Sequence, residues 1–155
     1  MALTSCNRRV AIVYASVTGN TEDAAETIKT IALEKGLEAE LWRVEEFPMA
    51  ELSRCGIVVV GTYTWGSGEI PREMRGLFEA FEKLGRKELV TAVFGTGDSF
   101  FAEFCGAVDR FRDMLYVHTD LTATLKIELR PQEQDYERCE KLIASIEERI
   151  EQRLF

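Results

Sequence analysis

Short apolar runs alternate with amphipathic stretches along the whole chain, and this alternation constrains the fold more than any other feature. The runs Val10–Tyr14 and Ile57–Val60 are continuous and rich in β-branched side chains, as strands buried on both faces of a parallel sheet require. Weaker strand candidates are Ala39–Val44, Leu89–Phe94 and Leu125–Leu129. Strands that alternate with helices predict an α/β layer fold built on a parallel sheet.

The stretches between the runs repeat apolar residues every three or four positions, with polar residues on the opposite side, which predicts amphipathic helices. Pro71 is expected as the first residue of the second helix. No internal repeat or linker divides the 155 residues, so we expect one domain over 1–155. The four helical series are Ala24, Ile28, Ile31 and Ala32; Met74, Leu77, Phe78 and Phe81; Phe104, Val108, Phe111 and Leu115; and Cys139, Ile143, Ile146 and Ile150.

Charge and cysteine usage narrow the function classes. The 27 acidic and 19 basic residues give a net charge of −8, which argues against binding to nucleic acid or to an anionic membrane surface. Cys6, Cys55, Cys105 and Cys139 form no C-x-x-C pair, and His118, expected at the surface, is the only histidine, so no metal site is predicted. Unpaired cysteines, with no secretory leader and no apolar stretch of about 20 residues, predict a cytoplasmic protein.

Chemistry is expected in the loops that follow the strands, because open α/β sheets bind ligands outside the carboxyl ends of their strands. The first loop combines hydroxyl side chains and a glycine with the start of a helix, whose N–H groups and dipole favour an anion. Its residues are Ser16, Val17, Thr18, Gly19, Asn20, Thr21 and Glu22.

The same loop has an ordinary structural interpretation, a helix start capped by Asn20 or Thr21. No lysine or arginine lies in the loop or next to it in the sequence, so we expect helix and peptide dipoles alone to neutralise a bound phosphate. The nucleotide fingerprints G-x-G-x-x-G and G-x-x-x-x-G-K-[ST] do not occur in the chain.

The second loop, 61–69, places Trp65 between glycines. A tryptophan in such a loop is poorly placed to join the core, and its flat face suits stacking on an aromatic ligand. The alternative is that Trp65 covers the edge of the core. The neighbours that complete this loop site are Tyr63, Thr64, Gly66 and Ser67.

The third loop, 95–105, contains two adjacent aromatic residues, Phe100 and Phe101. Both cannot face one core from one element, so at least one points towards a ligand or solvent. Asp98 has the alternative role of a helix cap. The backbone groups expected to matter here belong to Thr96, Gly97, Asp98, Glu103, Phe104 and Cys105.

Taken in order, these loops resemble those of the flavodoxin family. The matching motifs are S-x-T-G-N-T-E from Ser16, T-W-G from Thr64, G-x-G-D-S from Gly95 and F-C-G-A-V-D from Phe104. The resemblance implies that family's three-layer α/β/α sandwich with a five-stranded parallel sheet of order 2-1-3-4-5. The stretch 115–131 has no room for the long insertion of long-chain members, which implies the short-chain class.

The resemblance also implies FMN as the cofactor, bound without a covalent bond. Ser16 to Thr21 would bind its phosphate, and Trp65 would cover one face of the isoalloxazine ring. Phe101 stands where the family usually has a tyrosine on the other face, with Phe100 as the alternative. Backbone groups of 96–98 and 103–105 would meet the pyrimidine edge.

Two further positions bear on the redox tuning that the resemblance implies. Gly66 suits a peptide that flips so that its carbonyl accepts the N5–H of the reduced flavin, because glycine tolerates positive φ. Ser67 stands where relatives often have an acid, and losing that negative charge predicts a less negative second reduction potential.

The implied function is a low-potential one-electron carrier that shuttles between semiquinone and hydroquinone and has no substrate of its own. Its expected partners are NADPH-dependent flavodoxin or ferredoxin reductases and acceptor enzymes, bound weakly by a monomer through an acidic face. The alternative is an FMN-dependent quinone reductase, although the chain lacks extra segments for a substrate pocket. A flavin-free response regulator would need clustered acids after the first strand, and flavodoxin-like activators of ribonucleotide reductase lack these T-W-G and G-D-S motifs. The acids of the expected face are Glu45, Glu46, Glu69, Glu73, Glu79, Glu82 and Glu103.

Overall fold

The computed structural model describes residues 8–66, 68–99 and 103–153. Its five strands form one parallel sheet of order β2-β1-β3-β4-β5, which confirms the predicted sheet. The strands are β1 (Arg9–Tyr14), β2 (Glu38–Arg43), β3 (Ile57–Tyr63), β4 (Val90–Gly97) and β5 (Asp120–Glu128). The helices are α2 (Asn20–Glu34), α3 (Arg75–Leu84), α4 (Gly106–His118) and α5 (Glu133–Arg153), with short 3-10 turns η1 (Val44–Glu46), η2 (Met49–Ser53) and η3 (Arg72–Met74).

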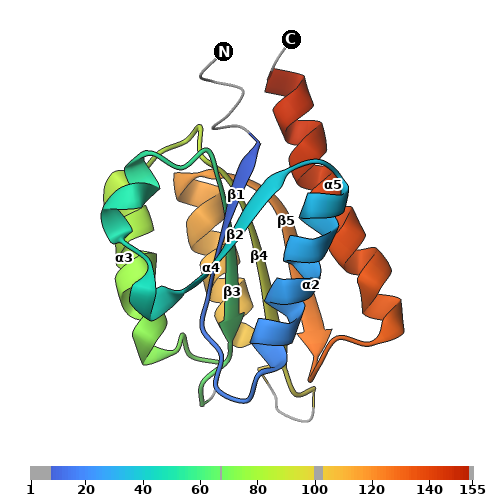
Figure 1. Cartoon of the computed structure of the whole chain (residues 1–155). Helices are drawn as coiled ribbons and strands as arrows, with labels where there is room; N and C mark the ends of the chain where they lie inside the picture. The colour runs from blue at the N-terminus through green and yellow to red at the C-terminus, as the bar shows by residue number, and fades with distance from the viewer. Residues whose placement is uncertain (1–7, 67, 100–102, 154–155) are drawn as a thin grey trace.

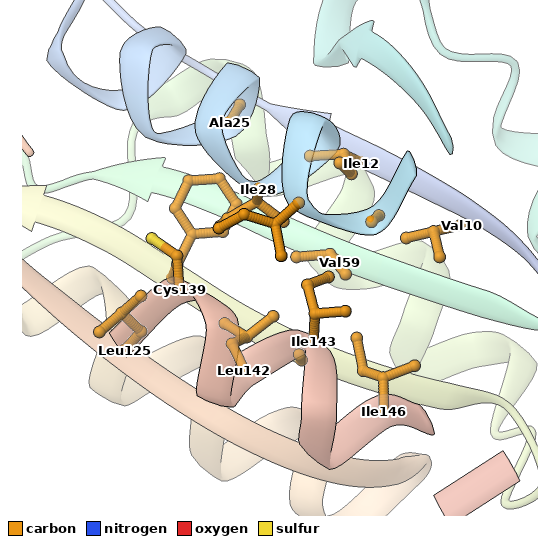
Figure 2. Close-up of a cluster of buried hydrophobic side chains, with 14 of the residues drawn as sticks. Val10, Ile12, Ala25, Ile28, Val59, Leu125, Cys139, Leu142, Ile143 and Ile146 are labelled. Carbon is orange, nitrogen blue, oxygen red and sulfur yellow. The ribbon is translucent and has the colours of Figure 1, made fainter. Parts of the chain in front are cut away.

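Helices cover both faces of the sheet, α2 and α5 on one side and α3 and α4 on the other (Figure 1). Successive strand residues point to opposite faces, so Val10 and Ile12 of β1 pack beneath α2 and α5, and Val13 packs beneath the other pair. Figure 2 shows the first cluster, with Ile28 of α2 and Ile143 of α5 directed towards the same strand side chains. Both faces of the central strands are therefore buried, which explains their continuous apolar runs.

Two glycines in the central strands are required by packing. A Cβ at Gly61 would lie 2.3 Å from Cζ of Phe94, and a Cβ at Gly95 would lie 2.2 Å from Cγ2 of Val108. The side chains of Phe94 and Val108 occupy the space that a side chain at Gly61 or Gly95 would need. Gly61 therefore leaves room for the ring of Phe94, its partner in the neighbouring strand, and Gly95 lets β4 approach α4 closely.

Three expected boundaries were wrong. Pro71 is extended, with ψ 146°, and precedes η3, so α3 proper begins only at Arg75. Phe104 lies in the turn before α4, and β5 begins at Asp120 rather than at Leu125. The start of β5 was missed because its first residues are half-buried and partly polar, as suits a strand at the edge of the sheet.

All strands point to the same edge of the sheet, the lower edge in Figure 1, where the three predicted loops emerge together. His118 ends α4, half-buried, just before β5. In the described part of the chain, no helix is both long enough and apolar enough to cross a membrane.

Candidate functional site

The first loop is held by the hydroxyl of Ser16. Its Oγ accepts hydrogen bonds from the backbone N–H of Gly19, at 3.1 Å, and of Glu22, at 3.3 Å. The helix N-cap is Gly19, with φ 95°, so the expectation that Asn20 or Thr21 caps the helix was wrong. Glycine is required at this position because the left-handed region is strained for other residues.

The loop keeps the donors that an anion needs. The first intrahelical bond of α2 runs from the N–H of Asp23 to the carbonyl of Gly19, so the N–H groups of Asn20 and Thr21 precede the helical ladder. Ser16 accepts two hydrogen bonds and retains its own O–H for donation to a ligand. This donor set fits a phosphate group at the start of α2.

Thr21 contributes to the site differently from the expectation. Its side chain is 1% exposed, and its hydroxyl pairs with that of Thr96, 2.7 Å away in β4. The hydroxyl therefore ties α2 to the sheet, which leaves the backbone N–H of Thr21 as its donor for a ligand. Val17 and Thr18 are exposed at the tip of the loop.

Trp65 does not join the core. Its side chain is 60% exposed, which excludes the alternative that it covers the core edge. Two backbone hydrogen bonds between Trp65 and Glu69, of 2.9 and 2.7 Å, close the loop into a small antiparallel bridge. Gly66 within it has φ 53°, whereas Ser67 lies outside the described residues and the peptide flip stays a prediction.

The two residues before Trp65 use their side chains structurally. The Tyr63 hydroxyl donates to Oε2 of Glu73 at 2.8 Å, and burial together with this bond raises the pKa of Tyr63 to about 12. The Thr64 hydroxyl accepts the N–H of Ala107 at 3.3 Å and so serves the first turn of α4. The Tyr63 hydroxyl is therefore held by Glu73, whereas the Thr64 hydroxyl, which accepts here, keeps its own O–H for donation.

The third loop is organised around Cys105, which has φ 53° and is the N-cap of α4. Its thiol is buried, which raises its pKa to about 11, and the contribution of the Cys105 backbone to the site stays a prediction. Gly97 approaches it so closely that a Cβ there would lie 3.0 Å from the Cys105 sulfur. Asp98 and Phe104 are half-buried, Glu103 is exposed, and the stacking candidates Phe100 and Phe101 lie outside the described residues.

The second and third loops contact each other directly. A Cβ on Gly106 would lie 2.6 Å from Cα of Gly68, and a Cβ on Gly68 would lie 2.8 Å from Cβ of Glu103. The guanidinium of Arg110 in α4 donates to the Gly68 carbonyl at 2.8 Å. The two loops therefore form one unit beside Trp65.

Two arginines approach the first loop, although the sequence around that loop contains none. Arg43 of β2 lies 3.7 Å from the Glu22 carboxylate, and Arg130, after β5, lies 3.6 Å from that of Asp23. The expectation that dipoles alone set the charge at this loop was therefore incomplete. No pattern local to the loop could have revealed these contacts, because Arg43 and Arg130 come from other strands' ends.

The assembled edge combines an anion cradle, an exposed tryptophan and closely packed backbone. This chemistry suits a planar aromatic ligand that carries a phosphate, which is the composition of FMN. Within the described residues, no group of three histidine, cysteine, aspartate or glutamate side chains is placed to hold a metal ion.

Comparisons with known proteins agree with this geometry. A family model described as Flavodoxin matches residues 12–142. Probable flavodoxin 1 of Bacillus subtilis is 39% identical over 134 residues, 83% of this chain and 83% of that protein. The solved flavodoxin of Streptococcus pneumoniae TIGR4 is 31% identical with a TM-score of 0.86, covering 91% of this chain and 99% of that one. The sulfite reductase [NADPH] flavoprotein alpha-component of Thiocapsa roseopersicina is 32% identical over 63% of this chain, which spans 19% of that protein.

Proposed function

The chain belongs to the flavodoxin family, and from that premise we propose how its three loops hold FMN and how the protein exchanges electrons. It is an FMN-binding electron-transfer protein, and bound FMN supplies the one-electron chemistry. The observation that carries the proposal is the 60% exposed Trp65 beside an anion cradle at the same sheet edge.

The first loop binds the phosphate end. The N–H groups of 17–21 and the hydroxyls of Ser16 and Thr18 donate to its oxygens, and the dipole of α2 stabilises its charge. The Ser16 hydroxyl already holds Gly19 and Glu22 in place, so little of the loop needs to be ordered on binding.

The second and third loops bind the ring. Trp65 covers one face, with Phe101, or alternatively Phe100, on the other. The backbone of 96–98 and 103–105 would donate to and accept from the polar edge of the ring, and Tyr63, Thr64 and Gly66 would shape the loop beside it. Trp65 would exclude water from one side of the bound ring, and the acidic residues nearby would disfavour added negative charge there, so that the bound cofactor would supply electrons at low potential.

Partner binding depends on charge. Flavodoxin-like segments occur inside larger proteins named as NADPH-dependent, such as the sulfite reductase flavoprotein of Thiocapsa roseopersicina. The exposed carboxylates of Glu69, Glu79 and Glu103 lie on the loops and helix near the site. We propose that they steer a cytoplasmic monomer to basic faces of NADPH-dependent flavodoxin or ferredoxin reductases and of acceptor enzymes, in weak and transient complexes.

The test is an anaerobic reductive titration of the purified protein, with the released flavin identified afterwards. The carrier function predicts bound FMN that takes up electrons in two separate one-electron steps, and no oxidation of NADPH unless a reductase is added. Direct oxidation of NADPH with a quinone as acceptor would favour the quinone reductase alternative. A protein that binds no added FMN would contradict the proposal.

A further inference from the structure

The first turn of α2 presents an electrostatic conflict. Glu22 and Asp23 both lie there, as the acids that a helix N-terminus favours. The proposed ligand brings a phosphate monoester to the same place, with about two negative charges near neutral pH. Unpaired carboxylates this close would repel it.

Both carboxylates are paired with arginines from distant parts of the chain. Glu22 accepts the Tyr14 hydroxyl at 2.9 Å and lies 3.7 Å from Arg43, whose guanidinium also sits 5.6 Å from the centre of the Tyr14 ring. Asp23 lies 3.6 Å from Arg130. Each acid of the first turn thus has its own cation.

The backbone after β5 sets the position of Arg130. Leu129 has φ 58°, which ends the strand, and its N–H donates to the Gly97 carbonyl at 2.7 Å in the third loop. Arg130 follows directly and lines one open cavity together with Asn20, the first residue of α2. The turn between β5 and α5 therefore places the positive charge of Arg130 beside the start of α2, where the phosphate loop ends.

The ion pair between Arg130 and Asp23 contributes little to the stability of the fold. The side chains of Arg130 and Asp23 are 67% and 50% exposed, and ion pairs as exposed as this contribute little to stability. Their effect on a doubly charged ligand nearby is larger, because every charge near the loop acts on both ligand charges.

We propose that Arg130 is a positioning residue for the anionic end of the cofactor: it cancels the charge of Asp23 so that the first turn of α2 accepts the phosphate. The inference rests on the proposed FMN function. It assigns to the β5–α5 turn a role that the sequence around the phosphate loop does not reveal. Arg43 does the same for Glu22, but its contact with Tyr14 makes it a less selective probe.

The experiment measures the dissociation constants of FMN and of riboflavin, which lacks the phosphate, with the cofactor-free protein at about 10 mM ionic strength. Arg130→Gln is expected to weaken FMN binding about threefold and Asp23→Asn to strengthen it about threefold. The double variant should return close to the unmodified protein. Riboflavin binding should not change in any of them.

Control variants distinguish the effect of charge at the phosphate loop from the effects of net charge and of impaired folding. Arg54→Gln removes the same single charge from an exposed pair with Glu51 that precedes β3, at the opposite edge of the sheet, and should leave both constants unchanged. Arg130→Lys keeps the positive charge and should bind FMN as the unmodified protein does. About 1 M salt should abolish the differences in FMN binding among the variants. Thermal unfolding of each variant checks that the fold is intact.

Two results would overturn the inference while leaving the proposed function in place: FMN binding unaffected by Arg130→Gln, or an equal loss of FMN and riboflavin binding, which would indicate a structural role. An unmodified protein that does not bind FMN would overturn both.

Discussion

Gly66 is a residue whose conformation, more than its contacts, determines what can replace it. Its φ is 53°, and among the described residues an added Cβ would meet only Oε2 of Glu69, at 3.9 Å. Gly66→Ala therefore costs conformational strain rather than a clash, and we expect the free energy of unfolding to fall by about 1 kcal/mol. Chemical denaturation measures this, with Gly66→Asn as control because asparagine tolerates the left-handed region. An equal loss in both variants would show that φ is not the cause.

Tyr14 and Tyr63 make the free energy of unfolding depend on pH in the alkaline range. Burial, followed by a hydrogen bond to Glu22 or Glu73, raises the pKa of Tyr14 and of Tyr63 to about 12 from an ordinary value of 10.0. The protonated phenols are favoured by the fold, so their contribution is complete below pH 10 and is lost as the pH rises towards 12.

Absorbance titration at alkaline pH checks this expectation. Tyr14 and Tyr63 should ionise well above the ordinary value, and Tyr14→Phe and Tyr63→Phe should each remove one late step. The pKa of Tyr136 is also raised, by its hydrogen bond to Glu34, so the two substitutions are needed to assign the late steps. Ionisation of all tyrosines in one step near the ordinary pKa would contradict it.

Among the elements, the contact between the second and third loops depends on Gly106 at the start of α4. Gly106→Ala would place a Cβ 2.6 Å from Cα of Gly68, where only backbone can yield, so we expect a loss of about 2 kcal/mol in unfolding free energy and weaker FMN binding. Gly76 in α3 is the matched control, because a Cβ there meets no atom within 4 Å in the part of the chain that the structure describes. Gly76→Ala should stabilise the protein by about 0.5–1 kcal/mol. Equal effects of the two substitutions would mean that the loop contact is unimportant.

Strands buried on both sides could be predicted from the sequence, and so could the edge strand β2, expected at Ala39–Val44 and observed at Glu38–Arg43, but the start of the edge strand β5 could not. The β-branched run in β3 predicts a strand directly, because both faces of β3 are buried and both therefore carry apolar side chains. At the edge, β5 alternates partial burial with polar residues, so only its apolar end from Leu125 was recognised. The start of α2 was predicted wrongly because the N-cap is Gly19, and the hydroxyl that accepts the N–H groups of the first turn belongs to Ser16, three residues earlier.

The predicted site residues follow the same division. Trp65 and the first loop could be singled out from local composition alone, as a tryptophan between glycines and as hydroxyl side chains before a helix. The roles of Thr21 and Arg130 depend on partners in β4 and α2 that lie far away in the sequence, so no local pattern could disclose them.

The charge of the whole molecule governs its encounters with partners. A net charge of −8, with exposed glutamates around the site edge, should make electron transfer from a cationic reductase fall about fivefold between 10 and 500 mM salt. Stopped-flow kinetics of flavin reduction measure this. Reduction by an uncharged small reductant is the control and should change little, while a reductase rate that is independent of salt would contradict electrostatic steering.

The order of the helices around the sheet has a consequence for synthesis on the ribosome. The face under α3 and α4 has all its covering elements once α4 has emerged, whereas the opposite face is shared by α2, the first helix, and α5, the last. Until α5 is made, the sheet face lacks the side chains of Cys139, Leu142, Ile143 and Ile146, which pack on it in the folded protein (Figure 2). Folding of this chain is therefore completed after translation of its final helix, and before that point the incomplete face is a natural substrate for chaperones that recognise apolar strands.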